Sequence, residues 1–215
     1  MNLTESQVSY WDRVANEKRF SHPLRLDWLA KHSNRQVRFL DYGCGYGRTL
    51  AELSTAGYEN LVGADFSMEM LLRAHAFVPG AGLVLNDGHS WPFRDESFDS
   101  VLLFAVLTCI PVSEEQRSLV AEVYRVLRPG GFLYLSDLLM NHDARNRERY
   151  ERDAGRYKCY GVFELPEGVV VRHHSDEWLA EITRPFEQLE YEPFTVTTMN
   201  GNESAALQYV GRKHV

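Results

Sequence analysis

Short apolar runs and amphipathic stretches alternate along the middle of the chain. The run at residues 99–106 is apolar without alternation, which is typical of a strand buried on both faces of a parallel sheet. Four other short runs fit strands, at residues 37–42, 60–64, 82–86 and 132–136. Helices are predicted between the strands, at residues 48–56, 68–76 and 113–127. This order predicts an α/β protein with a doubly wound, mostly parallel sheet.

The first 35 residues have a helical pattern instead. Val8, Trp11 and Val14 share one face at helical spacing, and a second apolar cluster surrounds Trp28. We expect this segment to be helical and to cover part of the sheet.

Residues 138–174 interrupt the alternation with a highly polar stretch. Arginines and acids are interleaved between positions 145 and 156, which is typical of a solvated helix. A basic surface that binds an acidic acceptor is the alternative. We expect this insertion and the N-terminal segment to form a mobile cover over the carboxyl edge of the sheet, because insertions at the ligand edge usually carry specificity.

The last part of the chain predicts one helix and two strands. Ser175 fits the N-cap of the helix. The strands, at about residues 188–198 and 205–210, are separated by Asn200-Gly201, which is typical of a reversing turn. The sheet should therefore have seven strands and end in an antiparallel hairpin.

Composition fits an ordinary globular protein. The chain has 215 residues, of which 44% are apolar and 25% charged, and this suits a single domain. We divide that domain into an N-terminal helical cover, a core, an acceptor-side insertion and a C-terminal helix and hairpin, at residues 1–35, 37–137, 138–174 and 175–215.

Charge and hydropathy exclude several classes of protein. A net charge of −7 and a pI of about 5.6 argue against a nucleic-acid-binding protein. No apolar run approaches the roughly 18 residues of a membrane span, and the first residues do not read as a signal peptide. The chain has three cysteines, an odd number, and we expect them to be reduced thiols. We expect a cytoplasmic protein, monomeric or homodimeric, whose partner is a small molecule rather than a nucleic acid or a membrane.

A glycine-rich loop follows the first strand of the core and leads into a helix. Gly43, Gly45 and Gly47 let the backbone turn tightly and approach a ligand closely, and the helix that follows presents free amides. A dinucleotide fingerprint would need its third glycine where this chain has Arg48. Asp41, two residues before the loop, also differs from that fingerprint.

Two neighbouring strands also end in acidic residues. Asp65 ends the second strand, where an acid can accept hydrogen bonds from both hydroxyls of a ribose. Asp87-Gly88 follows the third strand. Because open α/β sheets bind ligands at the carboxyl edge, we expect these groups to share one site.

Five motifs in order resemble those of class I S-adenosylmethionine-dependent methyltransferases of the broad small-molecule type. They are the loop from Asp41 to Gly47, Gly63–Ser67, Asn86–Gly88, Pro92–Asp99 and Arg125–Gly131. The resemblance spans residues 37–137. It implies a Rossmann-like fold, S-adenosylmethionine as cofactor and S-adenosylhomocysteine as product, but it does not identify the methyl acceptor.

The resemblance also implies a role for individual residues. The methionine end of the cofactor would be held by Asp41, Gly43, Gly45 and Gly47, and its amino group by the backbone carbonyl of Phe104. The ribose would bind Asp65, and the adenine would contact Phe66, Asp87 and Gly88. The N-terminal cover would supply Tyr10, Trp11 and, as a carboxylate partner, Arg19.

The acceptor side departs from several relatives. Many carry two histidines after the fourth strand, where this chain has Thr108-Cys109. The signature of adenine- and amide-methylating relatives and the acidic metal ligands of catechol-methylating relatives are both missing, so we expect no metal. His142 and His173 are the candidate catalytic residues, with a structural role as the alternative. Methyl transfer mainly needs alignment and exclusion of water, so a strong base is not required.

Three other functions remain open. Cys44 and Cys109 would suit the methylation of thiols, arsenic or tellurium, although small buried cysteines are more often fillers. A non-catalytic S-adenosylmethionine-binding protein is a second alternative. A nicotinamide oxidoreductase fits least well, because of Arg48.

Overall fold

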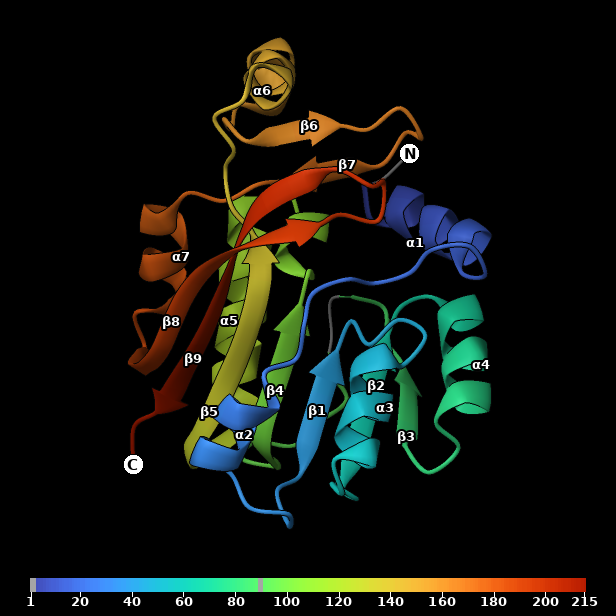
Figure 1. Ribbon diagram of the computed structural model, residues 1–215, viewed down its shortest axis with the longest axis vertical. Coiled ribbons are helices and arrows are strands. Elements are labelled where there is room, and N and C mark those ends of the chain that lie inside the picture. The colour runs from blue at the N-terminus through green and yellow to red at the C-terminus, as the bar shows by residue number, and fades with distance from the viewer. Residues whose placement is uncertain (1–2, 89–90) are drawn as a thin grey trace.

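The computed structural model describes residues 3–88 and 91–215. It contains a seven-stranded sheet in the order β3-β2-β1-β4-β5-β9-β8 (Figure 1). The strands are β1 (Phe39–Tyr42), β2 (Leu61–Asp65), β3 (Gly82–Leu85), β4 (Phe98–Phe104), β5 (Leu127–Leu138), β8 (Phe186–Thr197) and β9 (Glu203–Lys213). β1 to β5 are parallel, and β9 runs antiparallel to both β5 and β8. The predicted mostly parallel sheet with an antiparallel hairpin is confirmed.

Helices cover both faces of this sheet. One face packs against α2 (Leu26–His32), α3 (Arg48–Thr55) and α4 (Met68–Phe77), and the other against α5 (Ser113–Val126) and α7 (Asp176–Thr183) (Figure 1). In β1, Phe39 packs with the first group of helices and Leu40 with the second, because successive residues of a strand face opposite ways. Both side chains are fully buried, which explains the unbroken apolar run.

β5 is longer than the predicted strand at residues 132–136. It begins at Leu127, directly after α5, and so includes the Pro129-Gly130-Gly131 stretch. The pairing of β4 with β5 shifts between Phe98 and Ser100 to accommodate this stretch. The strand therefore starts where the proline and glycines suggested a loop.

The N-terminal segment is helical only in part. α1 (Leu3–Val14) and α2 are separated by residues 18–25, which have no regular structure. Tertiary contacts hold this connection: the Phe20 ring stacks on Tyr46, with ring centroids 4.9 Å apart, and the amide of Arg25 donates to the Tyr134 hydroxyl at 3.1 Å. Helical periodicity could not show this, because the stabilising partners lie elsewhere in the chain.

The insertion after β5 forms a small unit above the carboxyl edge of the sheet. It contains α6 (Ala144–Tyr157) and an antiparallel pair, β6 (Val162–Glu164) and β7 (Val170–Arg172), which the sequence did not predict (Figure 1). The side-chain amide of Gln7 in α1 donates to the carbonyl oxygen of Val170 at 2.7 Å, and Tyr10 packs on Val169. The two predicted cover segments thus contact each other.

No helix within residues 3–88 and 91–215 is long and apolar enough to cross a membrane.

Candidate functional site

The ends of β1 and β4 mark the point where the winding of the sheet reverses. From β1 the chain builds outward through β2 and β3, while β4 and β5 lie on the other side of β1. Ligands of open α/β sheets bind at such a point. A cavity lies there, and we call one wall of it the loop side. Its residues are Asp41, Gly43, Cys44, Gly45, Arg48, Thr49, Asp65, Phe66, Met70, Phe104, Ala105 and Val106.

The loop after β1 needs its glycines. Gly43, Gly45 and Gly47 have φ angles of +72°, +51° and +82°, in the left-handed region that favours glycine. The amides of Gly43 and Cys44 both donate to the carbonyl oxygen of Ala64, at 2.7 and 3.1 Å, and this fixes the loop against β2. Gly47 is the N-cap of α3, so the free amides of that helix follow directly.

Asp41 and Arg48 each bring an unpaired polar atom to the loop side. Asp41 is 2% exposed, and its Oδ2 is buried without a hydrogen-bond partner among the described residues. Burial raises the pKa of this carboxyl to about 7, against the opposing effect of Arg48. Arg48 donates to the carbonyl oxygen of His22 and pairs with Glu52, yet its Nε is buried without a partner in the same part of the chain. A ligand with an ammonium and a carboxylate group would satisfy both atoms.

Asp65 is held rigidly at the end of β2. Its Oδ2 accepts the amide of Gly45 at 2.8 Å, and its Oδ1 accepts the amide of Ser67 at 2.9 Å. Burial raises its pKa to about 6, although these backbone bonds favour the ionised form. Each carboxylate oxygen can accept a second hydrogen bond, so two neighbouring hydroxyls of a ligand can bind here.

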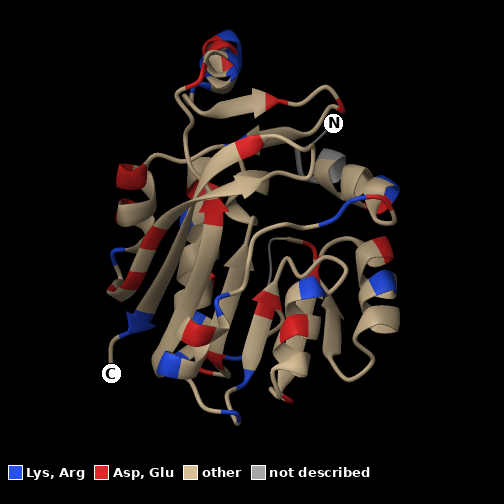
Figure 2. Ribbon diagram, viewed as in Figure 1, with Lys and Arg blue, Asp and Glu red and all other residues tan. Residues whose placement is uncertain are grey.

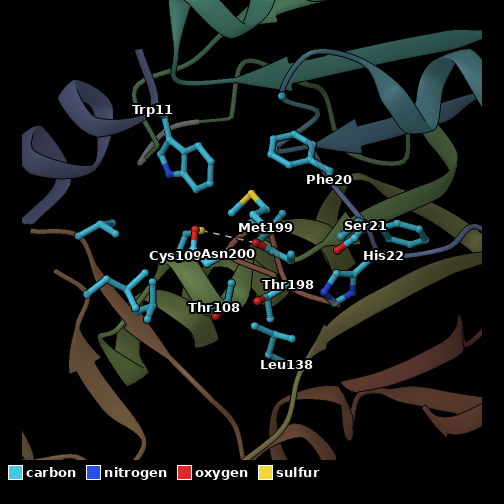
Figure 3. Close-up of a pocket in the computed structure, with 18 of the residues that line it drawn as sticks. Trp11, Phe20, Ser21, His22, Thr108, Cys109, Leu138, Thr198, Met199 and Asn200 are labelled. Atoms are coloured by element: carbon cyan, nitrogen blue, oxygen red, sulfur yellow. Dashed lines mark hydrogen bonds between the residues drawn. The ribbon is translucent and has the colours of Figure 1, made fainter. Parts of the chain in front are cut away.

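The opposite wall, which we call the cover side, comes from segments far apart in the chain. Its residues are Tyr10, Trp11, Phe20, Ser21, His22, Thr108, Cys109, Leu138, Arg145, Arg149, Phe163, Leu165, Val169, Val171, His173, Thr198, Met199, Asn200, Asn202 and Ser204. Figure 3 shows Trp11 and Phe20 approaching Met199 from different segments. Lys18 Nζ donates to Asn200 Oδ1 at 2.7 Å, which joins the N-terminal connection to the turn between β8 and β9.

The chain is similar in sequence to known proteins. Residues 40–135 match the methyltransferase domain family. A methyltransferase of Encephalitozoon cuniculi is 32% identical over 146 residues, which are 65% of each chain. Phthiotriol/phenolphthiotriol dimycocerosates methyltransferase 1 of Mycobacterium ulcerans is 38% identical over 105 residues, or 47% of this chain and 37% of that relative. The matches thus span less than two thirds of either relative.

A solved structure extends the comparison to most of the chain. An S-adenosylmethionine-dependent methyltransferase of Methanosarcina mazei superposes with a TM-score of 0.82 and 26% identity, over 87% of this chain and 97% of that one. Residues 40–135 thus belong to a class I S-adenosylmethionine-dependent methyltransferase domain. The cofactor of this methyltransferase is S-adenosylmethionine, and the unpaired atoms of Asp41 and Arg48 fit the amino and carboxylate groups at its methionine end.

Most of the predicted cofactor residues of the methyltransferase line the cavity. They are Tyr10, Trp11, Asp41, Gly43, Gly45, Asp65, Phe66 and Phe104. Gly47 lies behind them as the cap of α3, and Asp87 and Gly88 are exposed at the end of β3. These residues thus lie at or near the carboxyl edge of the sheet. The role of each in binding the cofactor stays a prediction.

Two predicted residues lie away from the cavity. Arg19 is exposed and does not line it, because the chain turns Phe20 inward instead; Arg48 brings the basic group to this end. His142 is also exposed and outside the lining. Its neighbour Asn141 takes the inward position and donates to Ser204 Oγ at 2.9 Å. These positions do not support a cofactor role for Arg19 or a catalytic role for His142.

His173, in contrast, is buried and lines the cavity. Its Nδ1 lies 2.6 Å from the Tyr150 hydroxyl and 3.4 Å from Asn141 Nδ2. An amide nitrogen can only donate, so Nδ1 accepts and the proton of the neutral ring is on Nε2. Burial, together with nearby Arg149, lowers the pKa of His173 well below its usual value. The ring is therefore neutral and presents a donor.

Several cavity residues carried no signal in the sequence. His22 is buried, with Nδ1 2.8 Å from Ser136 Oγ, and burial lowers its pKa to about 4. The turn at Thr198–Asn202 was predicted as a turn, but not as part of a binding site. Their positions depend on packing between distant segments, which no local pattern encodes.

Three buried carboxyls should make the protein less stable as pH rises. Burial raises the pKa of Asp41, Asp65 and Asp137 to about 7, 6 and 7. Between about pH 4 and pH 7 the folded state keeps protons on these carboxyls that the unfolded chain releases, so their contribution to the free energy of unfolding falls as pH rises, while His22, with its lowered pKa, contributes in the opposite direction. Asp137→Asn should flatten this fall by up to about 1.4 kcal/mol per pH unit. Urea unfolding from pH 4 to 8 measures it, with exposed Glu59→Gln as control; a slope equal to that of the wild type would contradict it.

Proposed function

We propose that this protein transfers a methyl group from S-adenosylmethionine to a small-molecule acceptor. The observation that carries the proposal is the buried Oδ2 of Asp41, which has no hydrogen-bond partner among the described residues and lies beside the glycine loop in the cavity. An unpaired buried acceptor is costly unless a ligand supplies its partner. An ammonium group of the bound cofactor would do so.

The loop side would hold the cofactor from end to end. Asp41, Arg48 and the glycine loop would bind the methionine part, and Asp65 the ribose. Phe66, Asp87 and Gly88 would contact the adenine, and the carbonyl oxygen of Phe104 would accept from the amino group. These assignments add one residue, Arg48, to the predicted cofactor-binding residues.

The chemistry asks little of the protein beyond placement. S-adenosylmethionine supplies an electrophilic methyl group whose leaving group is already good. The chain must align the acceptor with that methyl group and exclude water. Trp11, Phe20 and Met199 would exclude water from the cover side. His173 would orient an acceptor through its Nε2 proton rather than take a proton, because Nδ1 is engaged by Tyr150.

The alternative of thiol or metalloid methylation is less well supported. Cys44 and Cys109 both line the cavity, but burial raises the pKa of each thiol, so both stay protonated and are poor nucleophiles and ligands. Among the described residues, no group of three or more His, Cys, Asp or Glu side chains could hold a metal ion. We further propose a cytoplasmic location, in keeping with three free cysteines.

Calorimetric titration tests the cofactor assignment. We expect S-adenosylmethionine and S-adenosylhomocysteine to bind and NAD not to bind. Binding of NAD alone would overturn the proposal. Turnover of labelled cofactor with a pool of small molecules then separates an enzyme from a protein that only binds the cofactor.

A further inference from the structure

Four arginines of α6, other than the exposed Arg147, fall into two groups. Arg152 pairs with Asp153 at 2.6 Å and Arg156 with Glu164 at 2.5 Å. Neither Arg145 nor Arg149 forms an ion pair with another residue within 3–88 or 91–215, and both line the cavity. α6 contains both basic and acidic side chains (Figure 2), so acidic residues occur on the same helix as these two arginines. Within the described residues, the two arginines that line the cavity are thus without an ion pair, as is Arg147, which is exposed and outside the lining.

The placement of these two arginines does not benefit the helix. They are four residues apart and so share one face, where like charges repel. Arg145 lies in the first turn of α6, where a positive charge opposes the helix dipole, and the nearby acid, Asp143 at the N-cap, forms no ion pair with either arginine among the described residues. Burial lowers the pKa of the Arg149 guanidinium, and Arg145 lowers it further. An anion bound between them would offset all of these effects.

Arg149 is also held in a fixed position. Its guanidinium carbon lies 3.8 Å from the centre of the Phe163 ring, and its Nη2 donates to Asn146 Oδ1. Its Nε is buried without a hydrogen-bond partner among the described residues. A planar, oriented guanidinium with a free donor suits a carboxylate or phosphate, which it can bind through two parallel hydrogen bonds.

Charge is distributed unevenly in the cavity. Its two carboxyls, Asp41 and Asp65, belong to the loop side, and the described cover side contains no acidic residue. His173 is neutral there. The large side chains of the cover side are apolar, among them Trp11, Phe163, Leu165, Val171 and Met199. The cover side therefore combines apolar side chains with neutral polar groups, such as Thr198 and Asn200, and has its positive charge at one place.

We propose that the methyl acceptor is a small molecule with an apolar body and one anionic group, a carboxylate or a phosphate, and that Arg149, assisted by Arg145, binds that group. This inference rests on the proposed function, because it concerns the molecule that receives the methyl group. The apolar body would lie against the aromatic wall.

Matched probes test this proposal by calorimetry. They are 3-phenylpropanoate, phenyl phosphate and the neutral 3-phenylpropanamide, each titrated with and without S-adenosylhomocysteine. At least one anion should bind about tenfold or more tightly than the amide, and the better anion distinguishes carboxylate from phosphate. Arg149→Gln, which keeps a polar side chain but removes the charge, should abolish this preference, and Arg145→Gln should reduce it. Arg156→Gln, on the same helix but ion-paired, should keep it.

The outcomes separate the two proposals. Failure of S-adenosylhomocysteine to bind would overturn the proposed function, while the titrations without it still measure the anion preference. Equal binding of the anions and the amide, an unchanged preference in Arg149→Gln, or no binding of any probe would overturn the anionic acceptor.

Discussion

Replacing Asp65 by alanine is expected to weaken S-adenosylhomocysteine binding by about 1–3 kcal/mol. The change removes the charged acceptor for buried ribose hydroxyls. It also leaves the amides of Gly45 and Ser67 without the oxygens that accept them at 2.8 and 2.9 Å. Titration at pH 8 is the suitable measurement, because Asp65, with a pKa raised to about 6, is then ionised in the wild type.

The control for this variant is Glu59→Ala. Glu59 is exposed just before β2, at the opposite end of that strand from Asp65, and its loss should leave the affinity unchanged. If Asp65→Ala binds S-adenosylhomocysteine as tightly as the wild type, the ribose is held by other residues.

Gly45→Ala is expected to damage both stability and cofactor binding. The residue has a φ of +51°, and an added Cβ would lie 2.1 Å from Phe20 Cε2. Strain in the left-handed region and displacement of the Phe20 ring should lower the free energy of unfolding by about 1–3 kcal/mol. S-adenosylhomocysteine affinity should fall about tenfold or more, because the loop amides move with the backbone.

Gly80→Ala is the matched control. Gly80 has no positive φ, and no atom of the part of the chain that the structure describes lies within 4 Å of the position of its added Cβ. Its free energy of unfolding should stay within about 0.5 kcal/mol of the wild type. Equal effects of the two substitutions in urea unfolding and calorimetry would show that the loop conformation is not the reason for Gly45.

The loop side could be predicted from the sequence because its functional residues lie close together in the chain. Asp41, Gly43 and Gly45 lie within five consecutive positions, and the apolar run before them places them at a strand end. Asp65 follows the next run in the same way. Parallel strands bring their carboxyl ends to one edge, so strand assignment was enough to bring these residues together.

The cover side could not be predicted in this way. Phe20 reaches the cavity because its ring stacks on Tyr46, and His22 because it contacts Ser136. Neither contact follows from periodicity. The same limit applies to the carboxylate partner: the resemblance implied Arg19, which is exposed, whereas Arg48 at the start of α3 lines the cavity.

The order of strands has a consequence for synthesis on the ribosome. β5 lies between β4 and β9, but the chain must add α6, β6, β7, α7 and β8 before β9 exists. Throughout that interval the nascent β5 has one edge of unpaired backbone groups, next to the buried side chains of Leu133 and Leu135. An exposed apolar strand edge can pair with another chain. The half-made protein is thus prone to aggregation at a strand that is paired on both edges once β9 has been added.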